Sequence, residues 1–436
     1  MRFTPILALV IAACSTPPEP EPPMPCGGAT FEPLVLAAGG RARLDVAALG
    51  EELLEVTAMG AVEVVRDGSE VTIRGGYAGE PGAVHLRCST ESIDVPVTVE
   101  PVAMRPLRSW DETDAEAPPA REYFAWWQAD DGAIVLYGGF VYRPVQFTPS
   151  TDAFRLDPVT LVWSRLTSAG DVPPPGGRVA PGVGGAFLYF GGSAMAADGS
   201  LDTPPTLAEV TTDAETATFT SLAATGMPGS YTGSFVHDAE RDRWLSVCGA
   251  DTRVLGHHCR VHAYTPEAGF TELEVAGEAP VGRYGFHYAL DAETDRVIVF
   301  GGQIGSGNTA LIGDTWALEL APEDGSGPRW VRLFESVEGI SPRRNGAYVL
   351  DPEHHRLLVW GGTADGMTAV PGLEVLELDA GRERWIHVAL PSDVPPRASG
   401  GGVYDAPRHR ILWGFGNEAR LYTDLYELRL SAGAGI

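Results

Sequence analysis

The sequence predicts an all-β protein in which a six-bladed β-propeller follows a small β-sandwich domain. Three observations predict this division. A motif of one Asp, one Arg and a Gly pair recurs at intervals of roughly 50–60 residues in the larger, C-terminal part of the chain. The N-terminal part instead holds short strand-like alternations separated by Gly pairs. The 436-residue chain also exceeds the usual size of one domain, which favours a small domain beside a large one.

Residues 1–13 have the features of an export signal. Met1-Arg2 supplies a positive charge, and the apolar run that follows is too short to span a bilayer as a helix. Ile11-Ala12-Ala13-Cys14 resembles the bacterial lipobox, which implies cleavage before Cys14 and its lipidation. An ordinary signal peptide with a chance Cys is the alternative. Ser15 rather than Asp follows the Cys, so this resemblance implies an outer-membrane lipoprotein of a bacterial cell envelope.

Residues 14–25 have the composition of a tether. The segment after Cys14 reads STPPEPEPPMP. Repeated proline favours an extended polyproline II conformation that rises about 3.1 Å per residue. We therefore expect this segment to hold the folded part roughly 35 Å from a membrane, with the lipid anchor as the only membrane contact.

The charge of the chain argues against several partners. The formal net charge is −27, and all 31 basic residues are Arg, because the sequence contains no Lys. Such an acidic balance argues against nucleic acid and anionic lipid as partners. The lack of Lys excludes Schiff-base chemistry, and the sequence contains no dinucleotide, phosphate-loop or serine-hydrolase motif. We expect no cofactor.

The predicted sandwich domain spans residues 26–100. Its strand-like pieces alternate apolar and polar residues, and Gly39-Gly40, Asp67-Gly68 and Gly75-Gly76 mark its turns. The pattern resembles bacterial immunoglobulin-like modules, although it contains no diagnostic motif. We interpret this domain as a spacer.

Four Cys residues remain if Cys14 is acylated, and they would form disulfides in the oxidising compartment that an exported protein reaches. They allow three pairings. Shared domain membership favours Cys26–Cys88 and Cys248–Cys259.

The repeat that predicts the propeller occupies residues 101–430. In four segments an Asp is followed by an Arg at the fifth position and by a Gly pair, or its substitute, at the tenth and eleventh. These segments are Asp238/Arg243/Cys248-Gly249, Asp291/Arg296/Gly301-Gly302, Asp351/Arg356/Gly361-Gly362 and Asp405/Arg410/Phe415-Gly416. Two looser copies lead to Gly138-Gly139 and Gly191-Gly192. An aromatic residue with Leu or Val three positions later follows the variable loops, as in Trp163/Leu166, Phe219/Leu222, Phe270/Leu273, Trp330/Leu333 and Trp385/Val388.

This order of features resembles the kelch repeat, in which each copy forms one four-stranded propeller blade. The resemblance implies that the Gly pair ends the second strand where neighbouring blades leave no room for a side chain. It also implies that the aromatic residue of the outer strand packs between blades. The last copy lacks an outer strand, and Met104-Arg105-Pro106-Leu107 keeps the expected spacing. We therefore expect one blade to draw strands from both ends of the repeat region, which removes exposed sheet edges.

Five Arg residues that we align at one repeat position form the candidate ligand site: Arg121, Arg178, Arg283, Arg343 and Arg397. The kelch resemblance places this position at the start of the innermost strand, facing one mouth of the central channel. A ring of guanidinium groups there would bind a carboxylate or phosphate. The alternative is a structural role, in which each Arg bonds loop carbonyls or an acid of a neighbouring blade. Ser230 interrupts the ring in blade three.

Blade three is unusual because His257, His258, Cys259 and His262 lie within six residues. The three His are weak candidate ligands for zinc or copper. A disulfide between Cys248 and Cys259 is the simpler interpretation of this segment, so we predict no metal site.

These features favour a binding module over an enzyme. We expect a monomer that binds an envelope protein or a glycan through its loops, of which 140–153 and 193–207 are the longest early ones. The alternative is an enzyme similar to the bacterial periplasmic kelch proteins that mutarotate sialic acids, acting on an anionic sugar. The catalytic residues of those proteins are not matched one by one, and His287, four residues after Arg283, is the natural proton carrier on the inner strand.

Overall fold

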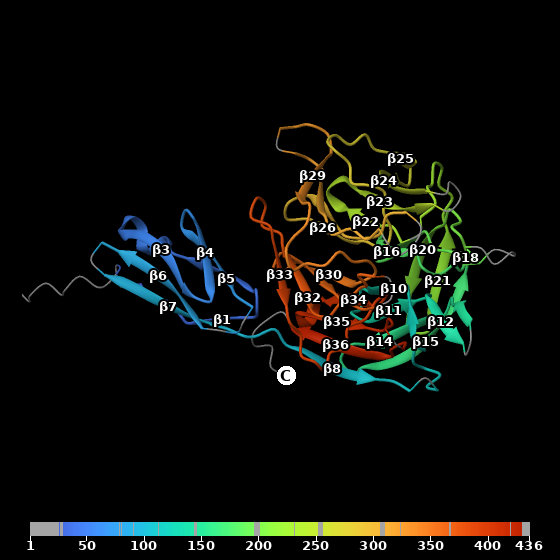
Figure 1. The fold of residues 1–436 in the computed structure, drawn as a ribbon, viewed down its shortest axis with the longest axis horizontal. Coiled ribbons are helices and arrows are strands. Elements are labelled where there is room, and N and C mark those ends of the chain that lie inside the picture. Colours follow the sequence, from blue (N-terminus) through green and yellow to red (C-terminus); the bar gives the residue numbers. More distant parts are fainter. Residues whose placement is uncertain are drawn as a thin grey trace, which may run out of the picture.

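Figure 1 shows the chain in the computed structural model, which describes residues 26–429 except 27–28, 78, 80, 90, 112, 144–145, 196–200, 231, 252–255, 306–309, 323, 366–367 and 419. The export signal, Cys14 and the tether lie outside the described residues. Almost all regular structure is strand, with short 3₁₀ turns at Ala47–Glu52, Ala239–Arg241 and Ala406–Arg408. No helix among the described residues is long and apolar enough to cross a membrane.

Two sheets form the N-terminal sandwich, with strand orders β1-β7-β6-β3 and β2-β5-β4. The strands are β1 (Leu34–Leu36), β2 (Arg41–Asp45), β3 (Leu53–Gly60), β4 (Val62–Asp67), β5 (Glu70–Gly75), β6 (Gly82–Cys88) and β7 (Ser92–Val99). Alternate residues such as Val71, Ile73, Val84 and Leu86 point inward and are fully buried, because side chains of a strand alternate between its two faces. The disulfide Cys26–Cys88 ties the start of the domain to the end of β6.

Six four-stranded blades form the larger domain. Blade one is β10 (Ala125–Gln128), β11 (Ile134–Tyr137), β14 (Ala153–Asp157) and β15 (Val162–Gly170), and blade two is β16 (Arg178–Pro181), β17 (Phe187–Phe190), β20 (Leu207–Thr212) and β21 (Thr216–Ser221). The outer strands β15 and β21 pair in parallel and join these two blades. Short hairpins extend from the loops after the Gly pairs: β12 (Phe140–Arg143) with β13 (Gln146–Pro149), and β18 (Ala194–Met195) with β19 (Leu201–Asp202).

The remaining blades repeat the same antiparallel order. Blade three is β22 (Val236–Asp238), β23 (Arg243–Asp251), β24 (Gly256–Thr265) and β25 (Gly269–Glu272), and blade four is β26 (His287–Asp291), β27 (Arg296–Phe300), β28 (Thr315–Glu319) and β29 (Arg329–Phe334). Blade five is β30 (Ala347–Asp351), β31 (Arg356–Trp360), β32 (Leu373–Glu377) and β33 (Arg384–Val388), and blade six is β34 (Gly401–Asp405), β35 (Arg410–Gly414), β36 (Asp424–Arg429) and β8 (Met104–Ser109).

The closure predicted from the sequence is confirmed. Strand β8 pairs with β36, with Met104 opposite Leu428 and Pro106 opposite Tyr426. The outer strand of blade six therefore comes from the segment that precedes blade one, and the ring of blades closes on itself.

The Gly pairs are required by the packing of neighbouring blades. Gly361 has a φ of +70°, and a Cβ there would lie 2.0 Å from the carbonyl oxygen of Arg397 in the next blade. Gly301 meets the carbonyl of Arg343 in the same way, at 2.7 Å. Cys248 and Phe415 hold the first position of the pair in blades three and six and adopt the same left-handed conformation.

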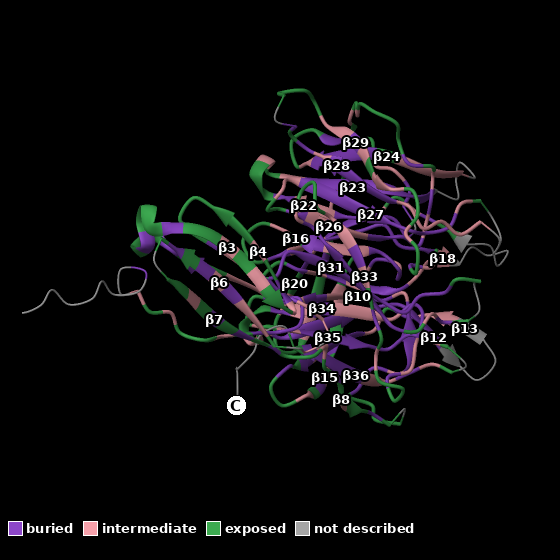
Figure 2. Ribbon diagram, turned by 60° about the vertical axis from the view of Figure 1, so that its left-hand side comes forward, coloured by how far each residue is buried: buried purple, intermediate pink, exposed green. Residues whose placement is uncertain are grey.

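The turn acids and the outer aromatic residues also behave as expected. The Arg that follows each turn acid bonds to it, for example Arg356 Nε to Asp351 at 2.8 Å and Arg410 Nε to Asp405 at 2.8 Å. Trp385 of blade five packs on Phe300 of blade four, with ring centroids 4.4 Å apart. Figure 2 shows the result as nearly continuous burial through the propeller, whereas the outer strands of the sandwich are largely exposed.

The sandwich contacts the outer side of blade five, beside β32 and β33 (Figure 1). Arg74 lies 3.0 Å from Glu377 and 2.7 Å from Asp379, and Arg356 donates to the carbonyl oxygen of Ala38 at 2.6 Å. The two domains are thus joined by buried ion pairs and by hydrogen bonds to main-chain groups.

Candidate functional site

Four of the five repeat Arg residues are wholly buried and donate hydrogen bonds to groups of the propeller itself. Arg283 donates to the carbonyl oxygens of Val281 and Gly301 at 3.1 Å and forms a two-point ion pair with Asp314. Arg343 and Arg397 make the equivalent bonds to a Gly-pair carbonyl and to an acid of the third strand. Their partners are Ser341, Gly361 and Glu374 for Arg343, and Phe415 and Asp424 for Arg397. Arg121 donates hydrogen bonds to the carbonyl oxygens of Pro119 and Gly138.

These contacts favour the structural role over the ligand ring. Each guanidinium fixes the loop that ends the second strand of its own blade, and the four side chains are at most 1% exposed. They do not line the central channel, so the expected position at the channel mouth is corrected for Arg121, Arg283, Arg343 and Arg397.

Arg178 does not hold the repeat position at all. Its partner across the ladder is Phe190, just as His287 pairs with Phe300 in blade four. Arg178 is therefore equivalent to His287, four residues after the repeat Arg. Its Nε donates to the carbonyl oxygen of Gly233 at 3.1 Å, and the residue lines the central channel.

The true equivalent in blade two is Pro174. The amide of Ser193 donates to the carbonyl oxygen of Pro175, as the amide of Gln303 donates to that of Tyr284 immediately after Arg283. Proline has no side-chain donor, so blades two and three both lack the repeat Arg. The repeat pattern misplaces Arg178 because Gly176-Gly177-Arg178 follows Pro174-Pro175, so that an Arg comes shortly after a Pro as in the other repeats.

The central channel holds a cavity of about 210 Å³. Glycines of blades two, four, five and six line it together with Tyr288, Tyr348 and Trp126. His287 lies behind this lining, fully buried. Its Nδ1 is 3.2 Å from the carbonyl oxygen of Phe300, its Nε2 accepts from the amide of Gly346, and burial lowers its pKa to about 3. His287 is therefore a neutral structural residue rather than a proton carrier for the channel.

The turns at one end of the channel are joined from blade to blade. Tyr123, Asn345 and Ser399 hold equivalent positions with left-handed backbones. The amide of Ser399 donates to the carbonyl oxygen of Asn345, whose own amide donates to that of Gly285. Asn345 Nδ2 also donates to the Tyr123 hydroxyl at 2.9 Å. Hydrogen bonds therefore link the turns of blades four, five and six at this end of the channel, and the Tyr123 side chain joins blade one to them.

A second network lies beside these turns, between blades three, four and five. Arg344 Nη1 donates to the Tyr284 hydroxyl at 2.9 Å, and the ring of His257 stacks on Tyr284 at 4.8 Å. Burial lowers the pKa of His257. Because a lowered pKa favours the neutral imidazole, His257 acts here as an aromatic ring stacked on Tyr284.

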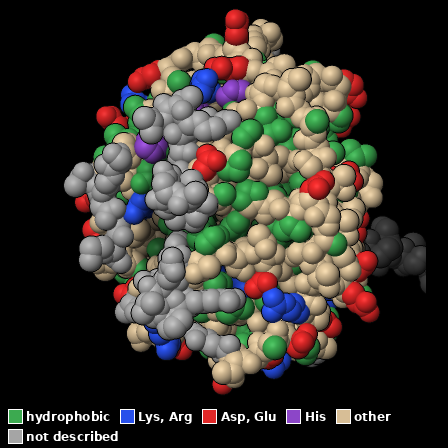
Figure 3. Space-filling model, turned by 90° about the vertical axis from the view of Figure 1, so that its right-hand side faces the viewer, with side chains coloured by type: hydrophobic (Ala, Val, Ile, Leu, Met, Phe, Trp, Pro, Cys, Tyr) green, Lys and Arg blue, Asp and Glu red, His purple; other side chains and the backbone are tan. Residues whose placement is uncertain are grey.

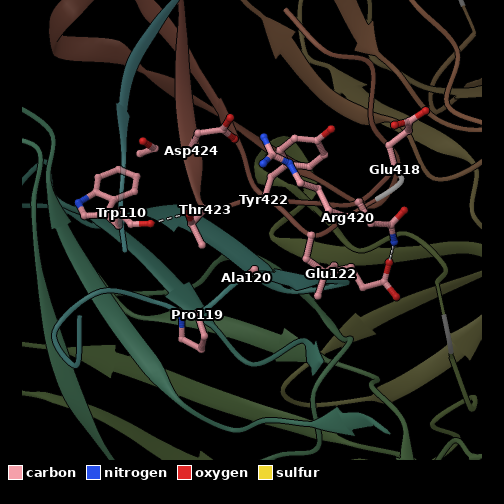
Figure 4. A pocket seen from close by; sticks show the side chains of 12 residues that line it. Trp110, Pro119, Ala120, Glu122, Glu418, Arg420, Tyr422, Thr423 and Asp424 are labelled. Carbon is pink, nitrogen blue, oxygen red and sulfur yellow. Dashed lines mark hydrogen bonds between the residues drawn. The ribbon is translucent and has the colours of Figure 1, made fainter. Parts of the chain in front are cut away.

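A cavity lies where blades six and one meet (Figure 4). Its volume is about 880 Å³. Asn417, Glu418 and the residues from Arg420 to Asp424 form one side, and Trp110, Ala120 and Glu122 form the other. The pairing of β9 (Arg121–Glu122) with β12 places Glu122 on the face that carries the loop hairpins, which Figure 3 shows with hydrophobic side chains near its centre and acidic ones toward its rim.

Glu122 is the most perturbed carboxyl group of this cavity. The residue is 8% exposed and is bonded by the side-chain amide of Asn417, and a hydrogen bond with Ser399 also favours its ionised form. Burial dominates and raises the pKa of Glu122 to about 7. A carboxyl group with this pKa is present in both protonation states near neutral pH.

Arg420 supplies the positive charge of the cavity. Its guanidinium lies over one side of the Tyr422 ring at 5.0 Å, and the buried Arg397 lies over the same ring at 4.0 Å. Stacking on the ring holds Arg420 in place while leaving its donors toward the cavity (Figure 4).

Among the described residues, which include the His-rich segment of blade three, no three His, Cys, Asp or Glu side chains converge in a way that could hold a metal ion. His258 and His262 lie with ring centroids 6.2 Å apart, and burial lowers the pKa of His262. Cys248 and Cys259 form a disulfide across the β23–β24 hairpin. Both predicted pairings are therefore present, whereas Cys14 lies outside the described residues.

Two known proteins are similar to parts of this chain. No protein-family model matches the chain. Adagio protein 3 of Arabidopsis thaliana is 25% identical over 314 residues, which cover 69% of this chain and 48% of that protein, so the chain spans about half the length of that relative. The solved structure of YjhT is 13% identical, covers 76% of this chain and 98% of its own, and superposes with a TM-score of 0.48.

The repeat motif, the six four-stranded blades and their closure through β8 define a kelch-like β-propeller. Its two disulfides are typical of proteins that reach an oxidising, non-cytoplasmic compartment.

Proposed function

We propose that this chain is a membrane-anchored binding protein of a bacterial cell envelope, whose propeller binds a glycan or protein partner. The observation that carries the proposal is the cavity between blades one and six. Its volume of about 880 Å³ falls within the range of ligand sites, and its walls combine the aromatic rings of Trp110 and Tyr422 with charged and hydroxyl groups. The lipobox-like segment at Cys14 and the Pro-rich tether support the anchored location.

Binding is tested by presenting the full chain to a glycan array and to cross-linking in an envelope fraction. We expect Arg420→Ala to lower the affinity for the captured ligand by about tenfold, because one charge-assisted hydrogen bond is lost. Arg382→Ala is the matched control, since Arg382 is an exposed Arg in the β32–β33 turn. Equal loss of binding in both variants, or no loss in either, would contradict the cavity as the binding site.

The anchor has its own test. Palmitate labelling of cells that express the full chain should mark the protein, and Cys14→Ala should abolish the label. A labelled Cys14→Ala variant would refute lipidation at this residue.

One observation favours a second function, that of an enzyme acting on an anionic sugar. Interconversion of sugar anomers needs a group that gives a proton to the ring oxygen and one that removes a proton from the anomeric hydroxyl. Glu122, whose pKa is about 7, suits both steps. Exchange rates between the anomers of a sialic acid, measured by NMR, should exceed those in buffer and fall in Glu122→Gln. Rates equal to those in buffer would exclude this function.

A further inference from the structure

Two groups of opposite charge line the cavity between blades one and six without pairing with each other. Glu122 is held by amide and hydroxyl groups, and its pKa is set by burial and Ser399 with no contribution from a cation. Arg420 contacts the Tyr422 ring and forms no ion pair within the part of the chain that the structure describes. Most Arg residues of this acidic protein do pair with carboxylates, as the neighbouring Arg397 does with Asp424.

A ligand that carries both charges would complement both groups. A guanidinium binds a carboxylate through two parallel hydrogen bonds, and a buried carboxylate gains most from a cation that replaces lost hydration. We propose that this cavity binds a zwitterionic ligand, namely an amino acid or a short peptide with free termini, with its carboxylate on Arg420 and its ammonium group on Glu122. The proposal rests on the function proposed above and names the ligand class of that same cavity.

The size of the cavity favours a peptide over a single amino acid. A volume of about 880 Å³ is near the upper end of the range for small-molecule sites, and a peptide of a few residues fills it better. Trp110 and Tyr422 add aromatic surface to the cavity, with Trp110 at the end away from Glu122 (Figure 4). The Thr423 hydroxyl, which donates to the carbonyl oxygen of Trp110, can still accept a hydrogen bond from a peptide amide.

The remaining charges of the cavity disfavour a purely anionic ligand. Glu418 and Asp424 line it in addition to Glu122, and the partner of Asp424, Arg397, is buried behind Tyr422. An anion would be attracted by Arg420 but repelled by the acidic groups, whereas an ammonium group gains from them.

The protonation of Glu122 makes the binding of an ammonium group dependent on pH. The charged and titratable groups around it are Tyr123, whose pKa is raised by burial, Arg344, Arg420 and Glu418. Glu122 binds an ammonium group when it is ionised, and its pKa is about 7. The ionised fraction of Glu122 rises about tenfold from pH 6 to pH 8, while the α-amino group of a peptide, whose pKa is near 8, loses about half of its charge. Affinity for a zwitterionic peptide should therefore rise about three- to fivefold over this range. A ligand bound only through its carboxylate should show the opposite trend.

The test is calorimetric titration of the full chain with four probes: trialanine, N-acetyl-trialanine, trialanine amide and glucuronate. At pH 8 we expect trialanine to bind about tenfold more tightly than either blocked peptide. Arg420→Ala should remove the difference between trialanine and its amide. Glu122→Gln should remove the difference between trialanine and its acetylated form and also the pH dependence. Arg382→Ala should bind all four probes as the unmodified chain does.

Three results would overturn the inference. Tighter binding of glucuronate or N-acetyl-trialanine than of trialanine, increasing toward pH 6, would show an anion site and leave the proposed binding function standing. Absence of peptide binding at millimolar concentration, in a chain that still captures a glycan or protein through Arg420, would reject the zwitterion and retain the cavity as the site. Loss of all cavity-dependent capture would reject both proposals together.

Discussion

Replacement of Arg343 by Ala should destabilise the propeller more than the same change at Arg283, although the two residues hold the same repeat position. Arg343 donates to the carbonyl oxygens of Ser341 and Gly361 and, at 2.6 Å, to Glu374, a side chain that is 1% exposed. Removing the guanidinium leaves this buried carboxylate with the His387 ring, 3.1 Å away, as its remaining side-chain partner among the described residues, and this loss of the guanidinium costs about 3–5 kcal/mol. The partner of Arg283, Asp314, is 18% exposed and can be hydrated, so about 1.5–3 kcal/mol is expected there.

These free energies translate into measurable changes in Tm. An unfolding entropy of about 2.1 cal/mol/K per residue, over a propeller that spans residues 104–429, converts about 3–5 kcal/mol into a decrease of about 4–7 °C. Calorimetric melts of Arg343→Ala, Arg283→Ala and the double variant Arg343→Ala with Glu374→Gln measure the difference. The double variant should regain part of the stability, because the unpaired charge is removed. An Arg343→Ala melt within 1 °C of the unmodified chain, or no gain from Glu374→Gln, would refute this reasoning.

Three further predictions concern stability. Burial lowers the pKa of His355, but its carboxylate neighbours, mainly Asp291, outweigh burial and raise this pKa to about 9. The protonated His355 therefore stabilises the folded state by roughly 3 kcal/mol below pH 6.5, and this stabilisation is lost as the pH rises to about 9. Urea melts at pH 6 and pH 10 should show the loss, and His355→Gln should abolish it. Gly361→Ala should destabilise by more than about 2 kcal/mol in urea melts, since its Cβ would meet the Arg397 carbonyl, whereas Gly381→Ala, with no atom within 4 Å, should cost about 1 kcal/mol. Loss of the Cys26–Cys88 bridge should cost about 4 kcal/mol and loss of Cys248–Cys259 about 3 kcal/mol, because the closed loops span 62 and 11 residues; the reverse order in denaturant melts of the Cys-to-Ala pairs would contradict the chain-entropy argument.

The fold could be predicted from the sequence because each blade repeats the same steric requirements. The Gly pair, the turn acid with its Arg and the outer aromatic residue each make a contact that recurs from blade to blade around the ring. Arg178 shows the limit of this reasoning, since the strand pairing of blade two shifts it four positions from the motif that it resembles. A local pattern cannot reveal such a shift when Pro174 has replaced the expected Arg.

The candidate cavity could not be found in this way. Glu122 and Asn417 are 295 residues apart in sequence, and they meet only because β8 closes the ring. Neither Glu122 nor Arg420 belongs to a motif. What distinguishes them is the burial of one and the stacking of the other, and both depend on the closed structure.

The position of β8 also has a mechanical consequence. Residues 100–103 alone separate β7, the last strand of the sandwich, from β8, the strand that completes blade six. Tension applied to the N-terminal side of the chain therefore reaches the ladder between β8 and β36 through residues 100–103, a linker too short to extend much first. The contacts of Arg74 with Glu377 and Asp379 form a parallel route that carries part of this load into blade five. The contacts between the sandwich and blade five thus share a load that would otherwise fall on the β8–β36 ladder alone.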